Sequence, residues 1–185
     1  MYKSKDIVIV SASRTPIGKF NGSLSNTPAH ELGAIVIKSV LEKANIAPSL
    51  VDEVIMGQIL TAGQGQNPAR QAAVLAGIPF EKPSWIINQL CGSGLKSVII
   101  AYQQIIMGDS NIMIAGGQEN MSLAPHYAHI RSGHKMGSFN MQDSMIVDAL
   151  LDVFYNYHMG ITAENIAKKW KISREEQDNF AYNSQ

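Results

Sequence analysis

Several features that define common classes of protein are missing from this sequence. Its fifteen basic residues balance fifteen acidic ones, so it lacks the positive excess that a nucleic-acid-binding surface normally needs. No stretch approaches the roughly 18–20 consecutive apolar residues that cross a bilayer. The apolar run at residues 7–10 is too short for the core of a signal peptide. We therefore expect neither a nucleic acid nor a membrane as a partner.

Cysteine is almost absent as well. Cys91 stands alone, so the chain can form neither an internal disulfide nor a zinc site built from cysteines. A protein without disulfides fits a reducing compartment, and we predict a cytoplasmic location. Charged residues make up 16% of the chain and hydrophobic residues 45%, which is the composition of an ordered globular protein.

Short apolar runs alternate with amphipathic segments up to residue 117. The runs predict strands at residues 7–10, 54–56, 85–87 and 112–115. Proline, cap and glycine signals predict helices over residues 28–44, from Asn67-Pro68 to Gly77, and from Gly92-Ser93-Gly94 to Gly108. This alternation predicts a layered α/β fold, with a largely parallel sheet and helices on both faces.

Two of these helices carry apolar stripes at helical spacing, which predict the faces that they bury. Thr27-Pro28 reads as the cap and first residue of the earlier helix. Its stripe consists of Leu32, Gly33, Val36, Ile37, Val40, Leu41 and Ala44. On the helix that ends at Gly108, we predict a buried side made of Leu95, Val98, Ile99, Tyr102 and Ile106.

The alternating pattern stops after residue 118. Residues 119–159 are rich in methionine, histidine, serine and glycine and have no sustained period. A segment this long is unusual as a connection, so we predict a functional insertion or a subdomain. A helix is expected again at residues 162–170, and Ser173 with Glu176 fits a capping box that opens another. Because the chain ends at Gln185 inside that pattern, we expect it to be part of a longer protein.

Cys91 is the residue with the most suggestive surroundings. It lies in Asn88-Gln89-Leu90-Cys91-Gly92-Ser93-Gly94, between a predicted strand and a predicted helix. The positive end of a helix dipole supports negative charge on sulfur, and the two glycines leave room for a substrate. A sharp turn of this kind can present a nucleophile, with backbone N–H groups nearby for an oxyanion. From the residues alone, a nucleophile and a buried structural cysteine both stay open.

The histidines give weaker signals. His126, His129 and His134 superficially resemble a metal cluster, but no acidic residue stands among them and their spacing is not that of a helical zinc site. We therefore predict loop histidines and no metal. His158 precedes the closing helices and fits either substrate contact or packing. The segment from Gly63 to Pro68 lacks a complete phosphate-binding motif, so a tight connection is the better interpretation.

Six segments of the sequence, in this order, resemble the thiolase family, and within it the biosynthetic acetyl-CoA acetyltransferase branch. They are residues 11–18, 26–33, 65–72, 88–94, 115–122 and 155–160. The resemblance extends from about residue 5 to residue 185. It implies a thiolase-like N-terminal core domain at residues 1–118, without its last strand, and part of a loop domain at residues 119–185.

The resemblance also implies roles for particular residues. Cys91 would be the nucleophile that takes an acyl group from acyl-CoA. His158 and Met159 correspond to residues that line the pantetheine and acyl pocket, and Leu150 falls in a stretch that approaches CoA. Residues 126–141 match the part of the loop domain that forms the family's tetramers, so we expect a homo-oligomer.

The reaction implied is the Claisen condensation of two acetyl-CoA molecules to acetoacetyl-CoA and CoA, through an acyl-enzyme thioester. Coenzyme A thioesters would be substrates, and neither a metal nor a bound cofactor would be required. A complete thiolase is about twice as long, and its second half carries a catalytic histidine and a second cysteine. Neither is found here. We expect the chain to be inactive alone and to need a complementary C-terminal half.

Three other interpretations remain. A catalytically dead remnant would act at most as a module that binds thiolase subunits. A related ketoacyl synthase also uses a nucleophilic cysteine on this fold, but the residues around Cys91 favour a thiolase. A redox sensor built on Cys91 lacks a resolving cysteine.

Overall fold

A computed structural model describes residues 6–185, which belong to two compact units. The first unit ends at Ser144 and the second comprises Met145–Gln185. The boundary predicted between residues 118 and 119 separates two domains of the family. The division into compact units does not test it, so it stays a prediction. Each unit is described separately below.

The centre of the first unit is a parallel sheet of three strands in the order β2-β1-β3. The strands are β1 (Glu53–Gly57), β2 (Ser84–Ile87) and β3 (Met113–Gly117). Val54, Ile55 and Met56 of the central strand are fully buried, as a continuous apolar run predicts. The predicted strands at 54–56, 85–87 and 112–115 are therefore confirmed, together with the parallel α/β fold.

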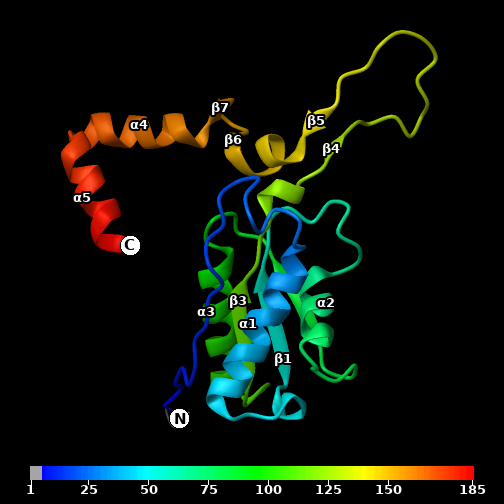
Figure 1. The fold of residues 1–185 in the computed structure, drawn as a ribbon, viewed down its shortest axis with the longest axis vertical. Coiled ribbons are helices and arrows are strands. Elements are labelled where there is room, and N and C mark those ends of the chain that lie inside the picture. Colours follow the sequence, from blue (N-terminus) through cyan, green and yellow to red (C-terminus); the bar gives the residue numbers. More distant parts are fainter. Residues whose placement is uncertain (1–5) are drawn as a thin grey trace. The chain divides into compact units, whose positions relative to one another are not determined.

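Helices cover both faces of this sheet. On one face, α1 (Ala29–Ala44) packs against α2 (Pro68–Leu75), and both share an apolar core with Val54 and Met56. The third helix, α3 (Ser93–Met107), contacts β1 and β3, and its first residue lies against Gly57. Because side chains alternate along a strand, Gly57 and Val54 face opposite ways, which places α3 on the other face. Figure 1 shows the strands between α3 and α2.

The ends of these helices follow most of the predicted signals. Asn67 caps α2, since its side chain accepts a hydrogen bond from the Arg70 N–H at 3.1 Å, and Asn45 ends α1 in the left-handed region. The predicted cap at Thr27 is wrong. Pro28 is the N-cap of α1 and no side chain caps that helix. The Thr27 carbonyl instead accepts a hydrogen bond from Asn120 Nδ2 at 2.7 Å.

The strand predicted at residues 7–10 is not formed. Its side chains are largely exposed, Ile9 to 80%, so this run is not covered on both faces. A groove of about 500 Å³ lies between residues 7–13 and β3, and α1 and α3 form its remaining walls. The prediction failed because an apolar run becomes a buried strand only where a neighbour pairs with its edge.

The buried side predicted for α3 is also wrong in large part. Leu95 is 69% exposed and Ile99 is 42% exposed, and Tyr102 and Ile106 are exposed as well. Only Val98 of the predicted set is half-buried. The residues that α3 buries are the small ones, Ser93, Ser97 and Ala101. Small side chains let the helix axis approach the sheet closely, which a face of leucines and isoleucines does not permit.

After β3 the first unit becomes irregular, as predicted. It contains one turn of 3-10 helix, η2 (Met121–Leu123), and a short antiparallel pair, β4 (His126–Tyr127) and β5 (Gln142–Asp143). The loop between these two strands projects away from them (Figure 1). Another 3-10 turn, η1 (Pro48–Leu50), precedes β1.

The second unit is mainly helical. A π-helical turn, η3 (Ile146–Leu150), leads into the antiparallel pair β6 (Leu151–Asp152) and β7 (Tyr157–His158). Two helices follow, α4 (Met159–Trp170) and α5 (Arg174–Ser184). The predicted capping box of Ser173 and Glu176 is confirmed at the start of α5. Among residues 6–185, no helix is long and apolar enough to cross a membrane.

Candidate active site

Cys91 lies on the turn between β2 and α3, and it is exposed. Gly92, the next residue, is the N-cap of α3. The predicted strand-to-helix turn around this cysteine is therefore confirmed, and a fully buried structural cysteine is not what the structure shows. An exposed thiol at this position is open to a substrate from solvent.

The backbone of the turn is tightly folded. The Gly92 N–H donates to the Gln89 carbonyl at 3.1 Å, and the Ser93 N–H donates to the Leu90 carbonyl at 3.0 Å. Leu90 has a φ of 50°, in the left-handed region that a bulky residue rarely adopts. The Asn88 side chain accepts a hydrogen bond from the Leu90 N–H at 2.9 Å. The residue just before the cysteine is thus held in a costly conformation.

The first turn of α3 leaves backbone donors available. Gly92 has no side chain, and no side-chain hydrogen bond caps this helix. The first bond of the helical ladder beyond the turn is donated by the Lys96 N–H to the Gly92 carbonyl at 2.9 Å, so the N–H groups of Gly94 and Leu95 precede it. Unpaired N–H groups at a helix N-terminus favour a negatively charged group there.

Glycines let the start of α3 approach the sheet. A Cβ atom added to Gly57 of β1 would lie 2.5 Å from the Ser93 carbonyl carbon and 2.6 Å from the Gly94 nitrogen. A Cβ atom added to Gly117 of β3 would lie 3.4 Å from the Gly94 Cα. The position of the Cys91 turn therefore depends on the two strands beneath it, since no side chain separates them from the helix.

Buried polar side chains lie at the carboxyl ends of β1 and β3. Gln118 Nε2 donates to Gln58 Oε1 at 2.8 Å, and Gln58 Nε2 donates to the Leu60 carbonyl at 3.0 Å. Glu119 accepts the Ile59 N–H at 2.8 Å. Burial raises the pKa of the Glu119 carboxyl, and the backbone N–H groups that it accepts oppose that effect only in part.

Sequence reasoning did not single out these three residues. The available signal was their position, because polar residues that directly follow a buried strand lie at the sheet edge where sites of α/β proteins form. Their hydrogen bonds connect the ends of two strands to the loop that follows β1. That loop is fixed further by Gln71 Nε2, which donates to the carbonyls of Gln64 and Gln66 at 2.8 and 2.9 Å. Such contacts agree with the interpretation of residues 63–68 as a tight connection.

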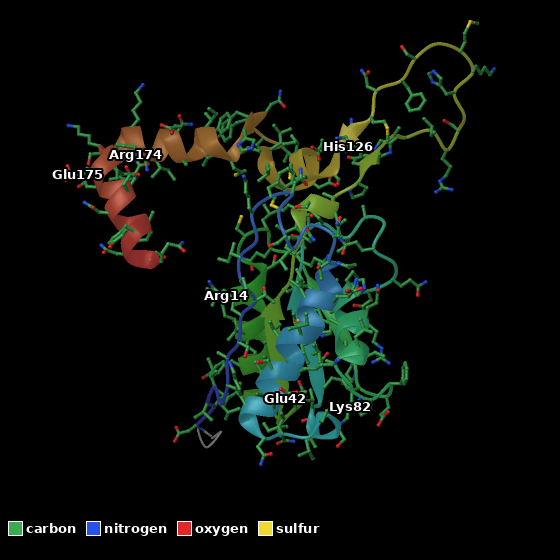
Figure 2. The ribbon with its side chains drawn as sticks, viewed as in Figure 1. Arg14, Glu42, Lys82, His126, Arg174 and Glu175 are labelled. Atoms are coloured by element: carbon green, nitrogen blue, oxygen red, sulfur yellow. The ribbon has the colours of Figure 1, made fainter. Side chains whose placement is uncertain are left out.

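The loop histidines do not gather into a site. His126 Nε2 lies 3.8 Å from Asp143 Oδ2 across the β4–β5 pair, and His134 hydrogen-bonds the Gly137 carbonyl at 2.7 Å. Figure 2 labels His126 at the base of the projecting loop. Within residues 6–185, no three side chains of histidine, cysteine, aspartate or glutamate come close enough to hold one metal ion.

The remaining predicted site residues lie together in the second unit. His158 is the N-cap of α4, where its Nδ1 accepts the Gly160 N–H at 2.9 Å, and Met159 is the first residue of that helix. Leu151 pairs with His158 across β6 and β7, so Leu150 directly precedes this pair. The acceptor role of Nδ1 assigns the ring proton of a neutral His158 to Nε2. The substrate-binding roles of these residues stay predictions.

Comparisons with known proteins identify the relatives of this chain. Residues 7–185 match the model of the thiolase N-terminal domain. An acetyl-CoA acetyltransferase of Rhizobium meliloti (strain 1021) is 62% identical over 179 residues, which are 97% of this chain and 46% of that protein. A cytosolic acetyl-CoA acetyltransferase of Rattus norvegicus is 60% identical over 182 residues, 98% of this chain and 46% of that protein. The chain spans about half the length of the curated relatives that it matches.

Proposed function

The chain belongs to the thiolase family, and we propose that it supplies the half of an acetyl-CoA C-acetyltransferase that carries the nucleophile. One observation carries this proposal. Cys91 is exposed on a strained turn at the N-terminus of α3, which no side chain caps, and backbone N–H groups at a helix N-terminus can stabilise an oxyanion. The relatives named acetyl-CoA acetyltransferase support acetyl-CoA as the acyl donor.

The first half-reaction follows from the chemistry of a thioester. The thiolate of Cys91 attacks the carbonyl carbon of acetyl-CoA, and the tetrahedral oxyanion is stabilised by the N–H groups at the start of α3. Collapse of this intermediate breaks the bond to the CoA sulfur. Coenzyme A leaves as a thiolate and takes up a proton, and the acetyl group remains on Cys91 as a thioester.

The second half-reaction needs a carbon nucleophile. A base removes an α-proton from a second acetyl-CoA, and the resulting enolate attacks the acetyl carbon on Cys91. The bond to the cysteine sulfur breaks, which releases acetoacetyl-CoA and restores the thiolate. The first unit offers no histidine or second cysteine on the Cys91 turn for this proton transfer. We therefore assign it to a complementary C-terminal half, and we expect the chain alone to stop at the acetylated enzyme.

We propose that the second unit also carries substrate-binding residues. In this proposal His158 and Met159 line the pantetheine and acyl part of the site, and Leu150 lies near CoA. Residues 119–185 would then form part of a loop domain over the coenzyme, and residues 126–141 would contact neighbouring subunits of a homotetramer. A cytoplasmic location fits these relatives, one of which is named cytosolic.

Intact-mass spectrometry of the folded chain after incubation with acetyl-CoA tests the first half-reaction. We expect the mass to increase by about 42 Da, the mass of one transferred acetyl group, and Cys91→Ser to remove the increase. A folded wild-type chain that gains no acetyl group would overturn the proposal that this half alone carries out acyl transfer. An equal gain in Cys91→Ser would show that another residue is the nucleophile.

A second candidate function is a subunit module that binds a complementary half without turnover. The groove between residues 7–13 and β3 and the exposed stripe of α3 favour it, because both are apolar surfaces without a partner among the described residues. The test is co-expression with a separate chain made of the remaining C-terminal part of the Rhizobium meliloti relative. A stable complex that forms acetoacetyl-CoA supports the first function, and a stable complex without activity supports the second.

A further inference from the structure

We propose that Ser93 is a positioning residue, whose side chain holds the turn that presents Cys91 to its substrate. This inference rests on the proposed function, because it concerns the reactivity of the nucleophile. The hydrogen bonds by which Ser93 keeps the strained turn in place do not depend on that function. Ser93 itself does not contact the reacting atoms in this proposal.

The turn needs such a restraint. Leu90 has a φ of 50°, and a leucine loses free energy in this region because its Cβ crowds the following carbonyl oxygen. The two neighbours of Cys91 do not restrain it, since Gly92 has no side chain and Leu90 is exposed. The Asn88 side chain and two backbone hydrogen bonds hold part of the turn, and a further restraint on the residues before Cys91 keeps Leu90 from relaxing to an extended or helical backbone.

The Ser93 hydroxyl supplies this restraint from within the turn. Its Oγ accepts a hydrogen bond from the Gln89 N–H at 2.8 Å and donates one to the Leu90 carbonyl at 2.5 Å. One small side chain thus fixes a backbone group in each of the two residues immediately before the cysteine. The bond to Gln89 also ties the segment that follows β2 to the start of α3.

Ser93 is itself fixed by what lies beneath it. Ser93 is only 4% exposed and packs against Gly57 of β1. A Cβ atom added to Gly57 would lie 2.7 Å from the Ser93 Cβ. A hydroxyl on this buried and closely packed backbone has little freedom to move. The position of Cys91 therefore depends on the central strand of the sheet, because Ser93 packs against that strand and bonds to the turn.

The same helix provides a matched control one turn later. Ser97 is fully buried, and its Oγ lies 2.6 Å from the Gly94 carbonyl and 2.9 Å from the Gly116 carbonyl. Ser97→Ala removes the same hydroxyl from the same buried face of α3. It disturbs no hydrogen bond of the turn that contains Cys91. A purely structural role for Ser93 predicts that Ser93→Ala and Ser97→Ala behave alike.

The test measures the second-order rate of alkylation of Cys91 by iodoacetamide at fixed pH, followed by mass spectrometry. In the held turn, the exposed Cys91 thiol lies one residue before the N-cap of α3, and a displaced turn changes the position and the access of the reacting sulfur. We expect Ser93→Ala to slow alkylation roughly tenfold, towards the rate of the urea-unfolded chain. Ser97→Ala should stay within about twofold of the wild type, although both variants lose stability in urea.

A double variant distinguishes positioning from general loosening. Asparagine tolerates the left-handed region far better than leucine, so Leu90→Asn should restore most of the alkylation rate in the Ser93→Ala background. The proposal is overturned if Ser93→Ala reacts as fast as the wild type, or if Ser97→Ala slows alkylation as much. It is also overturned if Leu90→Asn restores nothing.

This test is independent of acyl transfer. If the wild-type chain gains no acetyl group from acetyl-CoA but the alkylation rates follow the expected order, the proposed function fails and the positioning role stands. If acetyl transfer occurs but Ser93→Ala matches the wild type in alkylation, the positioning role fails and the proposed function stands.

Discussion

Helices α1 and α3 have similar apolar periodicity but very different surroundings. The stripe of α1 is buried or half-buried throughout, with Ile37 only 1% exposed, because α2 and the sheet cover it. The stripe of α3 faces solvent, while its small residues face β1 and β3. Periodicity therefore predicts that a helix has an apolar face, and it does not predict what covers that face.

The difference has a physical origin in side-chain size. The start of α3 lies so close to Gly57 and Gly117 that only small side chains fit between helix and strands. Its large apolar side chains must then point elsewhere. In a soluble protein, a stripe of this kind is typical of a surface that another chain segment or subunit covers.

The largest expected effect comes from truncating the same residue type on the two helices. Ile37→Ala removes a fully buried side chain and leaves a cavity, so we expect it to lower the free energy of unfolding by about 2–5 kcal/mol. Ile99→Ala removes a side chain that already faces solvent in part, and we expect a loss below about 1 kcal/mol. Urea denaturation of both variants measures the two values.

Equal losses in the free energy of unfolding for Ile37→Ala and Ile99→Ala would contradict the difference in burial between α1 and α3. They would mean that the α3 stripe is covered in solution, for example by self-association. Repeating the denaturation at two protein concentrations separates these cases, because stability that arises from association depends on concentration.

The second prediction concerns the contact between α3 and the sheet. Gly57→Ala places a methyl group 2.5 Å from backbone atoms of Ser93, so either the helix or β1 must shift. We expect a loss of about 1–3 kcal/mol in the free energy of unfolding. Gly116→Ala is the control, because its added Cβ would meet Met56 Sδ at 3.7 Å, an ordinary contact distance.

A Gly57→Ala variant as stable as Gly116→Ala would show that α3 does not depend on close approach to β1. Thermal unfolding of the two variants, followed by circular dichroism under the same conditions, gives this result directly. The crystal structure of a tolerated Gly57→Ala variant would then show which element had moved.

The sequence predicted local structure well where neighbouring residues both carry the sequence signal and form the structure. Asn67 before Pro68 and the capping box at Ser173 were predicted correctly, because a cap is decided by atoms within one turn of helix. The same is true of the turn at Cys91, where glycines and the end of a strand lie next to each other in the chain. Three of the four predicted strands also formed.

Apart from the local cap that was wrongly predicted at Thr27, the failures share a different cause. The run at residues 7–10 and the stripe of α3 were correctly recognised as apolar, but their neighbours could not be deduced from local pattern. The Gln58–Gln118 pair was missed for the same reason, since its partners are 60 residues apart. The left-handed Leu90 was missed because leucine carries no signal for that conformation.

The third prediction uses the polar groups at the carboxyl ends of β1 and β3. Gln118 lies beside Gly33 of α1, and its neighbour Glu119 is a carboxyl whose pKa is raised by burial. A carboxyl with a raised pKa in the folded state binds a proton more readily there than in the unfolded chain. Stability should therefore rise as pH falls through the folded pKa of Glu119, and this gain should stop near the ordinary value of 4.5.

Asp52 provides the opposite case on a less buried surface. The pKa of the Asp52 carboxyl is lowered, chiefly by the N–H groups of Asn111 and Ile112. Its contribution to the stability of the fold is therefore lost as pH falls below the ordinary value of 3.8. We expect Glu119→Gln to remove the gain in stability above pH 4.5, and Asp52→Asn to remove part of the loss in stability below pH 3.8. Urea denaturation across this pH range measures both, and a Glu119→Gln variant with the wild-type pH profile would contradict the first expectation.

The smallest expected effect on folding belongs to the exposed stripe itself. Because the Leu95 side chain is largely in water already, Leu95→Lys should change the free energy of unfolding by no more than about 0.5 kcal/mol. It should nevertheless reduce self-association, since a charge in an apolar stripe must be desolvated when two copies meet.

Leu75→Lys is the control, because Leu75 is an exposed leucine of α2 outside this stripe. Sedimentation velocity at matched concentrations should show weaker association for Leu95→Lys alone. An equal reduction in both variants would mean that added charge, and not the α3 stripe, controls association, and α1 and α3 would then differ in exposure without differing in what they bind.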